Sequence, residues 1–396
     1  MTRKHHKTNK AICLCSLERR TVLSVVLIAL ATGGMVVWKW QPAARDENNK
    51  PGTAQITKAE PRPQASPDAL VRAVSEINGA SGDSRQSLLD LQKSLMEMPA
   101  DEALVMIRGF LASGEDRATG LSFKIASDGL LTEWPTFRTF LLDVLAAIDP
   151  AAAAAIGREI LASPTSADEW ALALRNVARG EPLDESAYFL QRKTEELITN
   201  PEWQADPSIG YLNAFDVLVH IEATGSAPLL SDLIQRKDRK DLAHAGFLTI
   251  DRLMQRQPVD LLARLAADRA LQESRPEMVA QQFARADVRD HAQRQLLEQW
   301  LLDPKRTSTE LQSFAAVYPN ASQFVSDNLL TRPQAASGSD LADHDRQALA
   351  TVTGWSADPR YAGIREHLLL LQRRLDYFVA SREADTAPSH STPQTK

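Results

Sequence analysis

Prolines recur along this chain at intervals that are close to the length of one helix or one helix pair. Proline fits the first turn of a helix but breaks a helix from within, so this spacing limits each helix to a short stretch. Between the prolines, apolar residues follow a three–four spacing, as in Leu88, Leu91, Leu95 and Met98. The pattern predicts an all-α body with about 14 helices between residues 68 and 381. The punctuating prolines are Pro99, Pro135, Pro150, Pro164, Pro182, Pro201, Pro207, Pro228, Pro258, Pro276, Pro304, Pro319 and Pro359.

One segment departs from the helical pattern. Apolar and polar side chains alternate from Leu121 to Ile125, and the turn pair Asp128–Gly129 precedes Leu130 and Leu131. This order predicts a short β-hairpin inserted over residues 121–133, with a continuous helix or an irregular loop as the alternative. An insertion of this kind often projects from a helical scaffold, so the hairpin is also a candidate binding feature.

The stretch FRTFLLDVLAAIDPAAAAAIGREIL, residues 137–161, resembles a helix–turn–helix unit with Asp149–Pro150 at its turn. Serial helix pairs of this type resemble an irregular α-solenoid of the HEAT-like kind over residues 84–331. The resemblance concerns an architecture, because no strict repeat period can be identified. It implies antiparallel helix pairs and a scaffold that binds other proteins on a concave face.

Near the N-terminus, Thr21–Trp38 forms an uncharged apolar run of 18 residues. As a helix it spans about 27 Å, close to the thickness of a bilayer core. Basic residues precede the run, which predicts a single transmembrane helix in the cell inner membrane, with a cytoplasmic N-terminus and a periplasmic body. The alternative is a cleaved signal peptide, because Ala29-Leu30-Ala31 has the small-x-small form of a cleavage site after Ala31. Both alternatives export the body.

The expected organisation has five parts. Residues 1–20 form a basic cytoplasmic tail and residues 21–38 the membrane anchor. Residues 39–67 are a proline-containing polar linker that we expect to be disordered, because it has almost no large apolar side chain to bury. Residues 68–381 form the helical, repeat-like body. Residues 382–396 form a Ser/Thr/Pro-rich tail that we also expect to be disordered.

Charge and cysteine content exclude several classes of function. Residues 1–40 hold seven Lys or Arg and one acidic residue, which leaves 38 basic and 50 acidic residues in the rest of the chain. An acidic body repels phosphate backbones, so nucleic acid is not an expected partner. The two cysteines, Cys13 and Cys15, precede the apolar run. The body therefore has no disulfide framework and no cysteine-based zinc site.

No motif assigns a catalytic, cofactor-binding or metal-binding residue, and we predict a protein that is not an enzyme. The chain has no His-Glu-x-x-His, Gly-x-Ser-x-Gly, Walker-type or GxGxxG pattern. Asp343-His344-Asp345 contains three potential metal ligands, but it adjoins a Ser/Gly stretch and is expected to be a solvated polar segment. Glu185-Ser186 is similar to the start of a lytic transglycosylase site, yet Asp184 and Glu185 after Pro182 fit a helix start equally well.

The charged cluster from Arg236 to Asp241 is expected at a solvated turn between two helices, with a phosphate or lipid-head contact as the alternative. The leading functional hypothesis is therefore a membrane-anchored, exported helical scaffold that binds a protein partner in the cell envelope. The alternatives are an exported enzyme acting on cell-wall glycan and an accessory subunit of a membrane complex.

Overall fold

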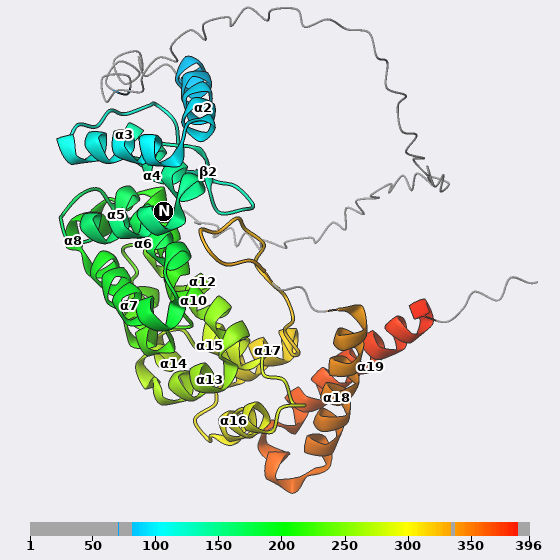
Figure 1. Ribbon diagram of the computed structural model, residues 1–396. Helices are drawn as coiled ribbons and strands as arrows, with labels where there is room; N and C mark the ends of the chain where they lie inside the picture. The colour runs from blue at the N-terminus through cyan, green and yellow to red at the C-terminus, as the bar shows by residue number, and fades with distance from the viewer. Residues whose placement is uncertain (1–69, 71–80, 334–336, 387–396) are drawn as a thin grey trace, which may run out of the picture. The chain divides into compact units, whose positions relative to one another are not determined.

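A computed structural model describes residue 70, residues 81–333 and residues 337–386 of the chain. The described part is mostly helical, and its only strands are those of one short hairpin (Figure 1). The all-α prediction is therefore confirmed for these residues. The expected anchor, Thr21–Trp38, and the linker lie outside the described residues. Within the described ranges, no helix is long and apolar enough to cross a membrane.

The first half of the described chain contains the hairpin and the helices from α2 to α10. Its elements are α2 (Ser81–Glu97), α3 (Ala100–Ser113), β1 (Lys124–Ile125), β2 (Leu131–Glu133), α4 (Phe137–Ile148), α5 (Pro150–Ile160), α6 (Ala167–Gly180), α7 (Leu183–Thr199), α8 (Pro201–Ala205), α9 (Ile209–Ala214), α10 (Asp216–His220) and the 3-10 helix η1 (Thr224–Ser226).

The second half is also helical and ends in two long helices. Its elements are α11 (Ala227–Gln235), α12 (Lys240–Arg256), α13 (Pro258–Ala267), α14 (Arg269–Ser274), α15 (Pro276–Phe283), α16 (His291–Leu302), α17 (Ser308–Val317), α18 (Gly338–Ala357), the 3-10 helix η2 (Pro359–Ile364) and α19 (Arg365–Thr386). Helix α19 extends past residue 381, where the sequence placed the end of the body.

Proline punctuates the helices as the sequence predicts. Pro150, Pro201, Pro258 and Pro276 are each the first residue of a helix, where the missing N–H removes no intrahelical hydrogen bond. The α4–α5 unit has the expected turn, because Asp149 ends α4 and its carboxylate accepts a hydrogen bond of 3.0 Å from the N–H of Ala152 in α5.

Helices α5 and α6 pack with their backbones in direct contact. A Cβ atom added at Gly180 would lie 2.1 Å from the carbonyl oxygen of Pro150, and one added at Gly157 would lie 2.8 Å from that of Ala173. These distances are too short for any side chain, so both positions require glycine. Since α4 and α7 also pack against α6, this close pair forms the centre of the first half of the described chain.

The predicted hairpin is confirmed. Strands β1 and β2 are antiparallel, Ile125 pairs with Leu131, and Gly129 lies in the connecting turn with a φ of +79°. This left-handed conformation explains the Asp-Gly pair seen in the sequence, since glycine adopts it without strain. The hairpin does not stand clear of the helices, because Phe123, Leu131 and the following Trp134 are buried in the hydrophobic core. Its role as a binding feature stays a prediction.

A buried ion pair holds the hairpin to the helices. Arg175 of α6 and Asp143 of α4 have side chains that are 0% and 1% exposed, and Nη1 lies 2.5 Å from Oδ1. The second oxygen of Asp143 accepts hydrogen bonds of 2.9 Å from the N–H of Leu131 and from Nε1 of Trp134. Arg175 also donates to the carbonyl of Gly129 at 3.1 Å. One pair of charges therefore joins the turn and the second strand of the hairpin to two helices.

An irregular segment, residues 319–333, returns from the end of α17 to the first half of the chain. The carboxylate of Asp216 in α10 accepts hydrogen bonds from the backbone N–H groups of Leu330 and Thr331, at 2.8 and 2.9 Å, and from the hydroxyl of Thr331. Arg179 of α6 donates to the carbonyl of Leu329 at 2.9 Å. Buried charged groups thus take the place of regular secondary structure in fixing this segment.

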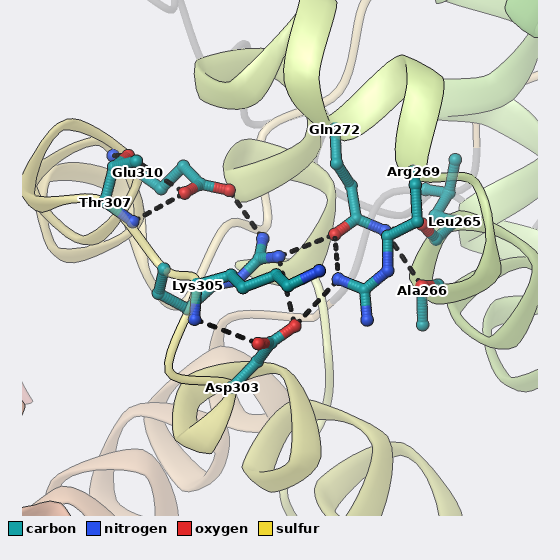
Figure 2. Close-up of polar contacts among 9 residues, drawn as sticks. Leu265, Ala266, Arg269, Gln272, Asp303, Lys305, Thr307 and Glu310 are labelled. Carbon is teal, nitrogen blue, oxygen red and sulfur yellow. Dashed lines mark hydrogen bonds and ion pairs between the residues drawn. The ribbon is translucent and has the colours of Figure 1, made fainter.

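A second polar cluster joins α13 and α14 to the loop between α16 and α17 (Figure 2). Arg306, whose side chain is almost fully buried, contacts Glu310 at 2.5 Å and the side-chain oxygen of Gln272 at 2.7 Å. The amide of Gln272 in turn donates to the last carbonyls of α13, on Leu265 and Ala266. These hydrogen bonds and ion pairs join residues at or near helix ends, so the cluster fixes those ends.

We predict that Asp143→Ala lowers the free energy of unfolding by about 3–5 kcal/mol, because it leaves the Arg175 guanidinium buried without its counter-ion. Urea denaturation of the full chain, followed by circular dichroism, measures the change. Asp343→Ala is the matched control, since Asp343 and Arg346 form an exposed ion pair at 2.5 Å whose loss should cost about 1 kcal/mol or less. Equal losses in the two variants would contradict the structural role given to the Arg175–Asp143 pair.

Candidate protein-binding groove

Helices α11, α12 and α15 enclose an open groove of about 610 Å³. This volume lies within the range of about 300–1,000 Å³ that is usual for ligand pockets, so a side chain and its flanking backbone can enter. We call this feature the α11–α12–α15 groove. It is lined by Ile234, Arg236, Lys237, Lys240, Ala243, His244, Phe247, Arg275, Glu277, Met278 and Gln281.

The inner part of the groove is apolar. Ile234, at the end of α11, is buried, while Phe247 of α12 and Met278 of α15 are each partly exposed and pack against the hydrophobic core. The Phe247 ring meets the Phe324 ring edge-on, with 6.1 Å between their centres. An aromatic ring and a flexible methionine together suit an apolar side chain from a partner.

The rim of the groove is positively charged. Lys237 and Lys240 are exposed, and neither ammonium group forms an ion pair within the described part of the chain. Arg236 and Arg275 add two more cations, whereas Glu277 is the only carboxylate among the lining residues. This local positive charge contrasts with the acidic excess of the sequence after residue 40.

The two arginines are held in place by the protein. Arg236 pairs with Asp238 at 2.5 Å and donates to the side-chain oxygen of Gln204 in α8 at 2.7 Å. The hydrogen bond from Arg236 lowers the pKa of Asp238 to about 2. Arg275 donates to the carbonyl of Ile234 at 3.0 Å, where its charge complements the negative end of α11. The rim therefore combines two fixed guanidinium groups with two unpaired lysines.

The cluster from Arg236 to Asp241 thus lies at the α11–α12 turn, as the sequence predicts. The sequence did not indicate that this turn borders a groove. The sequence shows Lys237 within a run of mixed charges. Phe247 and Met278 lie on two different helices, α12 and α15, and only the tertiary packing places both beside the groove.

Glu185 lies in the first turn of α7 and is exposed, as expected for a helix start. The adjacent Ser186 is buried, and its hydroxyl donates to the carbonyl of Pro182 at 2.9 Å. This hydrogen bond stays within the helix start, so the serine hydroxyl faces no substrate space beside the glutamate. The similarity to a lytic transglycosylase site is confined to these two residue types.

The expectation of a solvated stretch at Asp343-His344-Asp345 is wrong for two of its residues. All three lie in α18, and His344 and Asp345 are each only 8% exposed. Successive helical residues point about 100° apart, so the three side chains diverge. Asp343 pairs with Arg346 at 2.5 Å, His344 lies 3.7 Å from Asp287, and Asp345 lies 3.2 Å from Arg382. No group of potential metal ligands occurs in the described ranges.

Comparison with protein-family models, curated proteins and solved structures finds no match for this chain.

The pH dependence of stability tests the position of His344. Burial lowers the pKa of this side chain, although the carboxylate of Asp287 opposes the shift. The unfolded chain therefore takes up a proton near pH 6.5, before the folded chain does, and stability falls as the pH decreases through that value.

We predict that His344→Gln reduces the loss of unfolding free energy between pH 7 and pH 5, measured by urea denaturation at each pH. His291→Gln is the control, because His291 is exposed at the start of α16. An unchanged slope in His344→Gln would show that His344 does not contribute to the pH dependence.

Proposed function

We propose that this protein is an exported helical scaffold, anchored in the inner membrane by Thr21–Trp38, whose α11–α12–α15 groove binds an acidic segment of a partner protein in the cell envelope. The observation that carries the proposal is the pairing of an apolar floor with two unpaired lysines on the rim. A partner segment with one large apolar side chain between acidic residues matches this combination, since its charges and its apolar group each meet a complementary surface.

The arrangement of the helices supports a scaffold of the solenoid type. Consecutive helices pack against each other in α4–α5, α5–α6, α6–α7, α11–α12 and α12–α13. Contacts such as α6 with α9 and α15 with α17 interrupt this order, so we describe the proposed architecture as an irregular, HEAT-like α-solenoid. Stacked helices of this kind offer extended surfaces for protein partners.

Electrostatics supports a protein partner with an acidic segment. The sequence after residue 40 has 38 basic and 50 acidic residues, so its net charge repels anionic partners. The rim of the groove carries local positive charge, which attracts an acidic segment. Nucleic acid is not proposed as a partner, because a small positive patch on an acidic body offers few phosphate contacts.

Crosslinking from within the groove tests this proposal. A photoreactive amino acid at His244, in the full chain and in its own membranes, should give an adduct with one partner protein. We predict that Lys237→Glu combined with Lys240→Glu lowers the yield about tenfold or more, because both rim charges then repel the acidic segment. Added salt should lower the wild-type yield as well, since exposed charges are screened.

The control combines Lys93→Glu with Lys305→Glu, which changes the net charge equally at exposed positions outside the groove. This control should retain the wild-type yield. Equal losses in the two double variants would show that overall charge matters and that the groove does not select the partner.

An anchor exchange separates a scaffold from an accessory subunit whose membrane helix makes the contacts. We predict that replacing Thr21–Trp38 with an unrelated transmembrane segment preserves both the membrane localisation and the His244 crosslink. Immunoblots of membrane and soluble fractions measure the first, and the adduct measures the second. Loss of the adduct would favour the accessory subunit, and a soluble species that begins at Thr32 would show cleavage of the segment.

A further inference from the structure

A second, smaller pocket lies between α12, the end of α10 and the irregular segment 319–333. Its volume is about 100 Å³, well below the lower limit of about 300 Å³ for pockets that enclose a whole small molecule. Only one compact chemical group fits inside. The residues that define its chemistry are Val219, Arg252, Arg256, Asn328, Thr331 and Arg332.

Three guanidinium groups line this pocket, and most of their N–H donors have no acceptor among the residues that the structure describes. Arg252 donates to the hydroxyl of Ser326 at 2.6 Å through one nitrogen. Arg332 donates from Nη1 to two carbonyls of its own segment, each at 3.0 Å. Arg256 has one charged neighbour, Glu222, at 3.9 Å, which is beyond hydrogen-bond distance. Since each guanidinium carries five N–H donors, many remain available to a ligand.

The neighbouring carboxylates are engaged elsewhere. Asp216 accepts three hydrogen bonds from the 319–333 segment, and Asp251 pairs with Arg285 at 2.8 Å. Glu222 is therefore the only acidic group with a contact to the pocket's arginines in the described part of the chain. Three guanidinium groups and two nearby carboxylates, Glu222 and Asp216, therefore leave the pocket with a local excess of positive charge.

Burial is the main cause of two pKa shifts beside the pocket, and neighbouring charges modify both shifts. Burial lowers the pKa of His220, and the positive charges of Arg256 and Arg179 lower it further against the opposing effect of Asp216. Burial also lowers the pKa of Arg179 to about 10, with added repulsion from Arg175 and Arg332. These shifts agree with the geometry, which places several cations close together with few counter-ions.

We propose that this pocket binds a phosphoryl group, supplied by inorganic phosphate or by a small phosphate monoester. Guanidinium forks match the oxygens of a phosphate, and forks from two separate elements, α12 and the 319–333 segment, can contact a tetrahedral group from different sides. The size of the pocket admits the phosphoryl group alone, so the remainder of an ester would lie in solvent.

Isothermal titration calorimetry of the full chain in a non-ionic, phosphate-free detergent tests the proposal at constant ionic strength. The titrants are inorganic phosphate and glycerol 3-phosphate. Wild type should bind at one saturable site. Arg256→Gln and Arg332→Gln should each weaken binding about tenfold or more, because each removes a charged donor from the group. Arg256→Lys should give an intermediate loss, since it keeps the charge but not the fork.

Arg264→Gln is the matched control, because Arg264 pairs with Asp260 on an exposed face of α13 and does not line the pocket. It should bind as wild type does. The proposal is overturned if wild type shows no saturable binding of either titrant, or if Arg256→Gln and Arg332→Gln bind as tightly as Arg264→Gln. If a glutamine variant does not fold, the weaker phosphate binding of Arg256→Lys relative to wild type still tests the proposal.

The two titrants distinguish the sources of the phosphoryl group. Tighter binding of glycerol 3-phosphate assigns the site to a phosphate monoester, whereas equal or weaker binding assigns it to inorganic phosphate. The pocket shares no lining residue with the α11–α12–α15 groove, so the titrations and the crosslinking experiment at His244 test different residues.

Discussion

The buried ion pair between Arg175 and Asp143 is the constraint on which the first half of the described chain depends. Two charges can leave water only if the remaining donors and acceptors are satisfied, and here the side-chain oxygen of Asn176 and the hairpin supply those partners. The hairpin backbone supplies the N–H of Leu131 and the carbonyl of Gly129, and the adjacent Trp134 supplies an indole N–H. The hairpin and helices α4 and α6 therefore stabilise one another, which explains how two very short strands persist on a helical body.

Charged side chains connect elements in the rest of the body too. Asp216 fixes the 319–333 segment, and Arg306 fixes the ends of α13 and α17. Each of these groups has partners within the chain. The α11–α12–α15 groove and the arginine pocket differ in this respect, because Lys237, Lys240 and Arg256 keep charges that nothing in the described chain neutralises at close range. Such unneutralised charge beside a cavity is what distinguishes a candidate binding site from a structural cluster.

The sequence predicted those elements whose signals are local. Asp149–Pro150 marked the turn between α4 and α5, and Asp128–Gly129 marked the hairpin turn, because capping and backbone preferences act over a few residues. In α19, Leu368, Leu371 and Leu375 follow helical spacing and are all buried. Phe378 continues the same spacing but is 42% exposed, since periodicity cannot say how far a neighbouring helix extends.

From the sequence alone came the helical class, the helix boundaries at proline, the hairpin and the acidic charge of the chain after residue 40, because each depends on composition or on nearby residues. Only the tertiary structure decided that the hairpin packs inward and that His344 and Asp345 are buried. It also placed Lys237 and Met278 around one groove, and Arg256 and Arg332 around one pocket. These residues are far apart in the chain, and their proximity depends on how the helices pack, which no local pattern records.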